Sequence, residues 1–125
     1  MKQSVVSGVL VFNDKNEVLL VKKPDGVGPY PGTYLTPGGG VHIAEPADKA
    51  ATRELYEETG VEVKNLKRMW FSDVVTPNWE GVETHYIMLF YTAEYVSGNL
   101  QSTEEEPELE IIQWFDKKEV QKLPL

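Results

Sequence analysis

The chain contains no cysteine among its 125 residues. Disulfide bonds, a thiolate nucleophile and zinc held by thiolates are therefore excluded. The chain also lacks an apolar run of the roughly 20 residues that a membrane-spanning helix needs. Its first residues, MKQSVVSGVLVFNDKNEV, do not show the pattern of a cleavable signal peptide. These absences favour a cytoplasmic protein without a membrane partner.

Basic side chains are the scarcer charge, since 12 Lys and Arg accompany 20 Asp and Glu and give a net charge of −8. A negative surface disfavours docking on a nucleic-acid duplex, where cationic contacts to phosphates dominate affinity. It does not exclude a small phosphorylated ligand, because a bound divalent cation reverses the local sign. With 41% apolar residues, the composition and length predict a single folded domain over residues 1–125.

The order of apolar runs and turn residues predicts mostly strands. Valine-rich runs at 4–12 and 17–23, with NDKN between them, predict a β-hairpin. The segment 24–32 holds three prolines and three glycines and is predicted to be a loop. A helix is predicted from Pro46, which suits a first helical position, to a C-terminal cap at Gly60. Other strands are predicted at 33–36, 61–75, 84–96 and 109–115, with a short helix at 116–123. This order predicts a mixed α/β sandwich.

The end of the predicted long helix, RELYEETG (53–60), carries three glutamates, Glu54, Glu57 and Glu58. They lie three and four residues apart, where like charges on a helix repel. On a helical wheel of about 100° per residue they fall on or beside an apolar stripe, whereas Arg53 falls on the opposite, solvated side. The stripe consists of Ala47, Ala51 and Leu55. We therefore expect the acids to point toward the body of the protein.

Partly buried carboxylates need a cation or hydrogen bonds. A divalent metal satisfies all three acids, and oxygen ligands without His or Cys favour Mg²⁺ or Mn²⁺ over Zn²⁺. The plainer alternative is a solvated face on which Arg53 and Glu57 pair four residues apart. The preceding run TPGGGV (36–41) lets the backbone approach a ligand or metal closely, although three glycines alone are typical of a turn.

Residues 39–61, GGVHIAEPADKAATRELYEETGV, resemble the Nudix box, G-x5-E-x7-R-E-U-x-E-E-x-G-U with U aliphatic. Nine defined positions over 23 residues make a specific motif. All nine match: Gly39, Glu45, Arg53, Glu54, Leu55, Glu57, Glu58, Gly60 and Val61. The PGG stretch and the strand order also resemble the family, so the resemblance spans most of the chain. Family members often have Glu in place of His42 and Gly in place of Ala44, and these departures bear on loop shape and substrate fit.

The resemblance implies a Nudix hydrolase, with an α/β/α sandwich around a mixed β-sheet and a loop–helix–loop catalytic motif. Such enzymes split a nucleoside diphosphate linked to a group X into a nucleoside monophosphate and phosphorylated X. The resemblance implies that Glu54, Glu57, Glu58 and the Gly38 carbonyl bind Mg²⁺. Arg53 completes the predicted catalytic set and, with Glu45, braces the box. Glu54 is the first candidate for the base that deprotonates a metal-bound water.

A further metal ligand is predicted from the acidic stretch EEEPELE (104–110). Glu108 lies where the family often has such an acid, six residues before Trp114. Glu106 and Glu105 are the alternatives. The plain interpretation of this stretch is a solvated acidic loop.

The sequence says less about the substrate. Lys22, Lys23 and Gly39 are predicted to bind phosphates, although strand-end lysines are equally typical of a solvated surface. The candidates for stacking on a nucleobase are Tyr30, Tyr34, Trp70 and Trp79. Of the histidines, His42 is a weak substrate candidate and His85 is predicted to be a strand surface residue.

Two substrate classes remain open. Pro77, sixteen residues after the box, resembles the ADP-ribose pyrophosphatase subgroup. The short chain equally resembles MutT-like enzymes that hydrolyse nucleoside triphosphates. Signatures of the members that act on dinucleotide polyphosphates, coenzyme A or NADH are not evident. The alternative function is a catalytically silent module that senses a nucleotide, and a homodimer is a candidate assembly.

Overall fold

The computed structural model describes residues 1–22, 33–78, 80–101 and 111–122. These residues form strands and helices in the order β1 (Lys2–Phe12), β2 (Val18–Lys22), β3 (Tyr34–Leu35), β4 (Gly38–Gly40), α1 (Ala47–Thr59), β5 (Glu62–Pro77), β6 (Glu83–Ser97), β7 (Ile111–Phe115) and α2 (Lys117–Val120). No helix in this part of the chain is long and apolar enough to cross a membrane. The expected mixed α/β architecture is confirmed.

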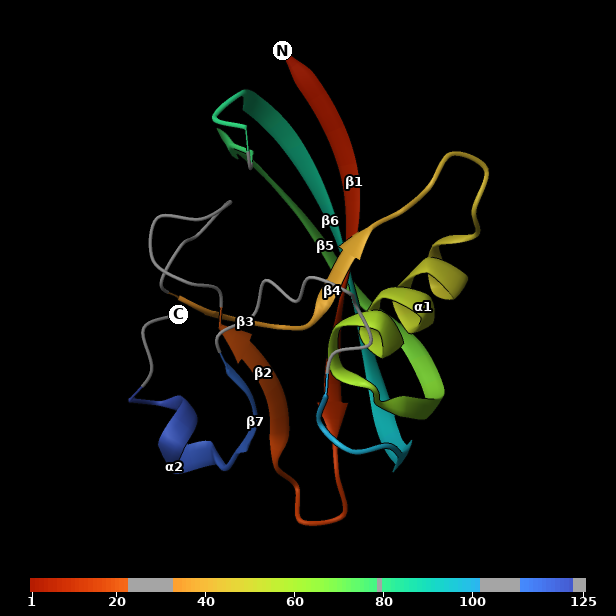
Figure 1. Ribbon diagram of the computed structural model, residues 1–125, viewed down its shortest axis with the longest axis vertical. Coiled ribbons are helices and arrows are strands. Elements are labelled where there is room, and N and C mark those ends of the chain that lie inside the picture. The colour runs from red at the N-terminus through yellow and green to blue at the C-terminus, as the bar shows by residue number, and fades with distance from the viewer. Residues whose placement is uncertain (23–32, 79, 102–110, 123–125) are drawn as a thin grey trace.

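One mixed sheet contains all seven strands, in the order β3-β2-β1-β6-β5, with β4 also paired to β1 and β7 to β2. β1 and β6 run parallel along the whole of β1, and β5 pairs antiparallel with β6. These three strands form one long ribbon, while β2, β3 and β7 form a second group beside it (Figure 1). The helix α1 lies against the long ribbon, and the single-turn α2 follows β7.

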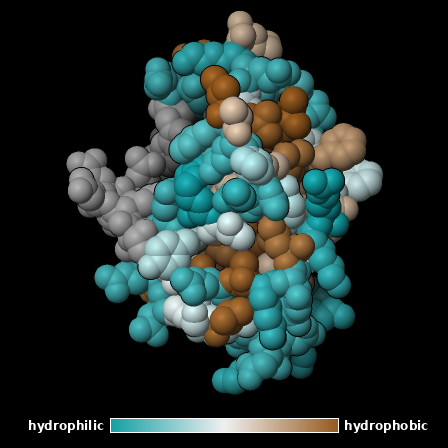
Figure 2. Space-filling view, turned by 90° about the vertical axis from the view of Figure 1, so that its right-hand side faces the viewer, coloured by the Kyte–Doolittle hydropathy of each residue, from teal (hydrophilic) through white to brown (hydrophobic). Residues whose placement is uncertain are grey.

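The core lies between α1 and one face of the β1–β6 pair. Val9 pairs with Tyr91 and Val11 with Ala93, so alternate residues of both strands meet the buried Leu55 of α1. Burying a side chain of this kind stabilises the fold by about 1.5–3 kcal/mol. Seen from the right-hand side of Figure 1, the surface is mainly hydrophilic, with hydrophobic side chains in separate patches (Figure 2).

Turn chemistry accounts for the first hairpin, which is confirmed. Phe12 pairs with Val18, and the side chain of Asn13 accepts hydrogen bonds from the backbone N–H groups of Lys15 (3.1 Å) and Glu17 (2.9 Å). Asn16 takes a left-handed conformation with φ 59°, which asparagine tolerates better than most residues. The predicted loop at 24–32 lies outside the described residues.

The long helix ends as predicted but begins slightly differently. Gly60 has φ 75° and its N–H bonds the Tyr56 carbonyl, as in a left-handed C-terminal cap. Pro46 has ψ 135° and therefore precedes the helix instead of forming its first turn. The short helix α2 is capped by Asp116, whose side chain accepts from the N–H of Glu119.

The glycine run forms a strand and not the turn that three glycines alone would suggest. Gly38–Gly40 form the strand β4, which pairs antiparallel with Val6–Gly8 of β1. A Cβ at Gly38 would overlap the backbone of Ser7. This approach to β1 is therefore open only to a residue without a side chain. The glycines thus act first in strand pairing.

Candidate active site

The strand β4 lies directly beneath the acidic end of α1. The N–H of Gly38 donates a hydrogen bond of 2.6 Å to Oε1 of Glu58. A methyl group at Gly39 would overlap the carboxylate of Glu54. Two of the three predicted acids are therefore turned from the helix onto the glycine strand, as the helical wheel predicted. Gly38, Gly39, Glu54 and Glu58 meet in space.

Arg53 does not lie on a solvated face, so that part of the wheel prediction is wrong. Its Nε and Nη2 donate to the two carboxylate oxygens of Glu45, at 2.8 and 2.9 Å. Nη2 also donates to the Gly40 carbonyl at 3.0 Å. Nη1 reaches Glu54 at 2.9 Å and Glu57 at 3.2 Å. The long side chain folds back along the helix because acids on both sides attract it.

These contacts connect the loop before α1 to the helix end. Glu45 precedes the helix, Gly40 ends β4, and Arg53 bonds both. The bracing role expected for Arg53 and Glu45 is the one this geometry supports. The i, i+4 pairing of Arg53 with Glu57 is present as well, so the plainer alternative from the sequence describes part of the same network.

The pKa values of the two acids Glu45 and Glu54 in this network are shifted in opposite directions. Hydrogen bonds from Arg53, and then from the N–H of His42, lower the pKa of Glu45 to about 2. Burial raises the pKa of Glu54, although Arg53 opposes this shift. The pKa of Arg53 is raised above its usual range, chiefly by its hydrogen bonds to Glu45. Glu54 is thus a carboxylate that holds a proton more readily than usual, as suits a proton acceptor.

The donor set fits a magnesium ion by its chemistry. Three carboxylates and a glycine backbone provide only oxygen ligands. Among the described residues, no three Asp, Glu or His side chains converge tightly enough to hold one ion as they stand. Instead, Arg53 holds Glu54 and Glu57, and the Gly38 N–H holds Glu58. Glu57 is more open than Glu54, with 41% of its side chain exposed against 15% for Glu54.

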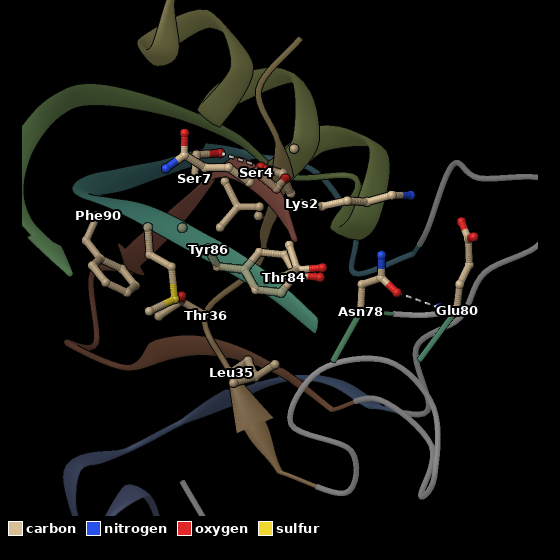
Figure 3. A pocket seen from close by; sticks show the side chains of 17 residues that line it. Lys2, Ser4, Ser7, Leu35, Thr36, Asn78, Glu80, Thr84, Tyr86 and Phe90 are labelled. Carbon is tan, nitrogen blue, oxygen red and sulfur yellow. Dashed lines mark hydrogen bonds between the residues drawn. The ribbon is translucent and has the colours of Figure 1, made fainter. Parts of the chain in front are cut away.

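A cavity of about 550 Å³ lies against the opposite face of the β1–β6 ribbon. Phe90 projects from β6 toward Thr36, and the ring of Tyr86 lies beside Thr84 (Figure 3). The wall is mainly apolar, with Val6 and Met88 beside these residues, and Lys2, Asn78, Glu80 and Thr84 add polar groups. All three residues of β4 line the cavity as well. The same glycines therefore touch the acids of α1 and form a wall of the cavity.

Tyr86, Met88 and Phe90 are site residues that the sequence did not reveal. They belong to the apolar run HYIMLFY, in which alternation between the two faces is hidden because both faces carry apolar side chains. Gly8 is a sequence feature that indicates this arrangement, because a Cβ at this position would approach Thr36 and the ring of Phe90. It becomes interpretable only once β1 is paired with β6.

Other predicted substrate residues lie elsewhere. The Nζ of Lys22 lies 5.8 Å from the ring centroid of Tyr34, whose edge packs on Phe115 at 5.3 Å. These residues belong to the β2–β3–β7 group and do not line the cavity. Trp70 is on β5. The remaining candidates, Lys23, Tyr30, Trp79, Glu105, Glu106 and Glu108, are outside the described residues.

Neither histidine lines the cavity. His85 is on the β6 surface, as predicted, with Nε2 2.7 Å from Oδ2 of Asp73 and Nδ1 3.1 Å from Nε2 of Gln3. The side chain of His42 is 69% exposed in the loop before α1. Ala44, two residues later, has φ 64°, a conformation that glycine adopts more easily.

Comparison with known proteins identifies the class. The model of the NUDIX domain family matches residues 1–125. The chain therefore belongs to the Nudix hydrolase family, and the resemblance found in the sequence is confirmed. It is 36% identical over 118 residues to the NAD-capped RNA hydrolase NudC of Pseudomonas aeruginosa, matching 94% of this chain and 38% of the relative. The chain thus spans little more than a third of that relative's length.

Solved structures confirm the Nudix fold. A MutT NUDIX hydrolase from Burkholderia pseudomallei superimposes with a TM-score of 0.79 and 26% identity, over 100% of this chain and 89% of that one. The NUDIX domain of Shewanella oneidensis NrtR, solved with ADP ribose, gives a TM-score of 0.77 at 21% identity, over 100% and 80% of the two chains. The second likeness concerns the fold alone.

Proposed function

We propose that this protein is a Mg²⁺-dependent hydrolase of the pyrophosphate bond in a nucleoside diphosphate linked to a group X. One observation carries the proposal. The glycine strand β4 touches Glu54 and Glu58 on one side and lines the cavity on the other. A substrate in the cavity would therefore hold its phosphates close to the acids.

Glu54, Glu57, Glu58 and the Gly38 backbone would hold the magnesium, with Mn²⁺ as a substitute. The metal would neutralise phosphate charge and lower the pKa of a bound water. The chain's own groups supply the rest. Glu54 is the proposed proton acceptor, since its carboxylate is partly buried against β4 at the acidic end of α1. Arg53 positions Glu54 and Glu57 and does not need to touch the substrate.

The reaction consumes one water molecule. Its oxygen bonds to one phosphorus, the bridging P–O bond breaks, and the products are a nucleoside monophosphate and phosphorylated X. The leaving phosphate carries its charge as an anion, so stabilisation of charge is the main task of the site. No side chain needs to form a covalent bond to the substrate.

For the substrate, the cavity favours a nucleoside with an aromatic base between apolar walls. ADP-ribose-like compounds and nucleoside triphosphates were predicted from the sequence. The relative NudC, an NAD-capped RNA hydrolase, adds NAD-capped RNA to this set. The single domain over 1–125, the cytoplasmic location, Glu108 as a late ligand and a homodimer remain predictions.

The direct test is to incubate the full chain with ADP-ribose, NAD, sugar nucleotides, and normal and oxidised nucleoside triphosphates, with and without Mg²⁺ or Mn²⁺. Products are separated by chromatography. Metal-dependent release of a monophosphate supports the hydrolase. Saturable binding of one of these nucleotides without any product would instead identify the silent sensor, against which the complete set of box acids argues.

A further inference from the structure

The strand β5 lies at the end of the sheet and exposes three large apolar side chains in succession. Met69, Trp70 and Phe71 are 45%, 68% and 66% exposed. The rings of Trp70 and Phe71 stack on each other, with centroids 5.7 Å apart. Among the described strands β5 pairs with β6 alone, so its other edge has no strand beside it there. A contiguous apolar surface of this kind is typical of a contact with another molecule.

Exposed charges of opposite sign flank the two rings. Lys67 and Arg68 precede them and Asp73 follows them. Within the described part of the chain, neither cation has an acidic partner within 4.0 Å. Asp73 contacts His85 at 2.7 Å, yet 66% of its side chain remains exposed. Residues 67–73, which we name the β5 patch, therefore have a basic side, an aromatic centre and an acidic side.

The β5 patch is symmetric about its centre because β5 is irregular. The register on β6 shifts between Arg68 and Trp70, as in a β-bulge, so Met69 adds no length to the ladder. The pairs are Lys67–Thr92, Arg68–Tyr91, Trp70–Phe90, Phe71–Leu89 and Asp73–Ile87. Counted along β6, Lys67 lies two positions before Trp70, and Asp73 lies two positions after Phe71. Cation and acid are thus each about 7 Å along the strand from the nearer ring-bearing residue.

A surface with this spacing is complementary to a copy of itself turned by 180°. A twofold axis between Trp70 and Phe71 would set the two β5 strands antiparallel, so that the same patch is used on both copies. The rings of one copy would then pack on those of the other, and each Lys67 would face Asp73 of the second copy. The bulge interrupts the row of backbone groups at this edge. We therefore expect side chains, and not a continued sheet, to form the contact.

The available area suits a weak, reversible dimer. One aromatic side chain buries about 150–250 Å², so two rings that are two-thirds exposed offer roughly 200–330 Å² per copy. The flanking side chains add to this, but the total stays below the roughly 800 Å² per partner of a typical stable interface. The chain has a net charge of −8, so two copies repel over most of their surface. The β5 patch, with two cations and one acid, is an exception.

We propose that the β5 patch binds a second copy of this chain and forms a twofold-symmetric dimer. Trp70 and Phe71 of both copies form its centre, and Lys67 and Asp73 form reciprocal ion pairs on either side. The sequence suggested a homodimer only as a candidate assembly, and the β5 patch adds the surface and the orientation. Residues 67–73 do not line the cavity and include none of the box acids. This proposal therefore does not depend on the proposed function.

The test is sedimentation of the full chain from about 1 to 200 μM, the range in which a small interface associates. We expect the mean mass to rise from that of one chain toward that of two as concentration increases. Trp70→Ala should weaken the dimer at least about tenfold, because aromatic residues at the centre of an interface carry much of its affinity. Circular dichroism checks that each variant is folded.

Exchange of the charged residues tests the orientation. Lys67→Glu would set two acids opposite each other, and Asp73→Lys would set two cations opposite each other. Each variant alone should weaken the dimer about tenfold through repulsion. The double variant Lys67→Glu/Asp73→Lys restores opposite charges across the twofold axis. It should recover the affinity of the wild type to within about threefold, since both ion pairs form again in reverse.

Matched controls use exposed residues outside β5. Tyr56→Ala removes an exposed ring on α1, and Lys118→Glu reverses an exposed cation on α2. Both should change the dissociation constant less than about threefold, as is usual for residues outside an interface. The mass of a single chain at every concentration would overturn the proposal. A dimer that is unchanged in Trp70→Ala, or that the double charge variant does not recover, would overturn it too, because assembly would then use another surface or orientation.

Discussion

The two faces of the β1–β6 ribbon are built from alternate residues of the same two strands, yet they do different work. On one face Val9, Val11, Tyr91 and Ala93 are buried beneath α1. On the other, Val6, Tyr86, Met88 and Phe90 line an open cavity. The first face holds the helix that carries the acids, and the second offers room for a ligand. Side chains along a strand point alternately to opposite faces. One face of these two strands can therefore pack against the helix while the other face lines a binding cavity.

The glycine strand β4 connects these two faces. It pairs with β1, touches the acids of α1 and lines the cavity. At Gly38 a Cβ would overlap the backbone of Ser7, and at Gly39 a Cβ would displace the carboxylate of Glu54. If the two faces have these separate roles, substitutions on α1 should change turnover, substitutions in the core should change stability, and substitutions in the cavity should change KM.

The largest expected effect is on turnover, from Glu57→Gln. The substitution keeps the shape of the side chain and removes a proposed metal-binding charge that is half-exposed. We expect kcat to fall about a thousandfold, since catalysis here depends on stabilising charge. Thermal unfolding should change by only a few degrees.

Steady-state kinetics with the best substrate of the panel, at saturating Mg²⁺, measure this loss. Glu62→Gln, just outside the box on β5, is the matched control and should keep full activity. More than a tenth of the wild-type kcat in the Glu57 variant would contradict the proposed role.

The next effect is on stability, from Leu55→Ala. Leu55 has no exposed surface and lies in the core between α1 and the ribbon. Its truncation should reduce the free energy of unfolding by about 2–5 kcal/mol. Urea denaturation measures it. Tyr56→Ala, the next residue along the helix and 46% exposed, should cost no more than about 0.5 kcal/mol, and a similar cost for both would refute this packing.

A smaller effect is expected in the cavity, from Phe90→Leu. This change removes the ring that lines the wall and keeps an apolar side chain. We expect KM to rise about tenfold through loss of base stacking, with kcat altered less than twofold. Phe12→Leu, on the same strand pair but away from the cavity, should leave KM unchanged. A fall in kcat alone would show that Phe90 acts on the chemistry and not on binding.

The smallest effect is the contribution of Glu45 to stability in acid. Its folded pKa of about 2 lies below the ordinary value of 4.5. The ionised group therefore stabilises the fold above about pH 4.5, and this contribution disappears as pH falls toward 2. Melting temperatures of the wild type and Glu45→Gln should converge over that range.

Glu54 should behave with the opposite sign. Burial raises its pKa, so the folded state binds its proton more readily than the unfolded chain does. Protonation of Glu54 thus favours folding as pH falls. The melting temperature of Glu54→Gln relative to the wild type should therefore be more favourable at neutral pH than in acid. Parallel pH profiles for the two variants would show that the pKa values of Glu45 and Glu54 are not shifted in opposite directions.

The sequence by itself determined the family, the hairpin, the long helix and its glycine cap. Each depends on neighbours along the chain: the spacing of the box acids, Asn13 in its turn, and Gly60 with its left-handed backbone. The helical periodicity of the sequence also predicted that Glu54 and Glu58 point toward the body of the protein. It failed for Arg53, because its partner Glu45 lies in the loop before the helix and the wheel does not represent it.

Only the tertiary structure decided where the cavity lies and what lines it. Tyr86 and Phe90 belong to an apolar run without alternation, and the face they occupy follows from the register of β6 on β1. Likewise, Lys67 and Trp70 pair with Thr92 and Phe90, alternate residues of β6, only because the register of β5 on β6 shifts between them. Pairing between distant strands sets these positions, and a single sequence contains no direct record of register.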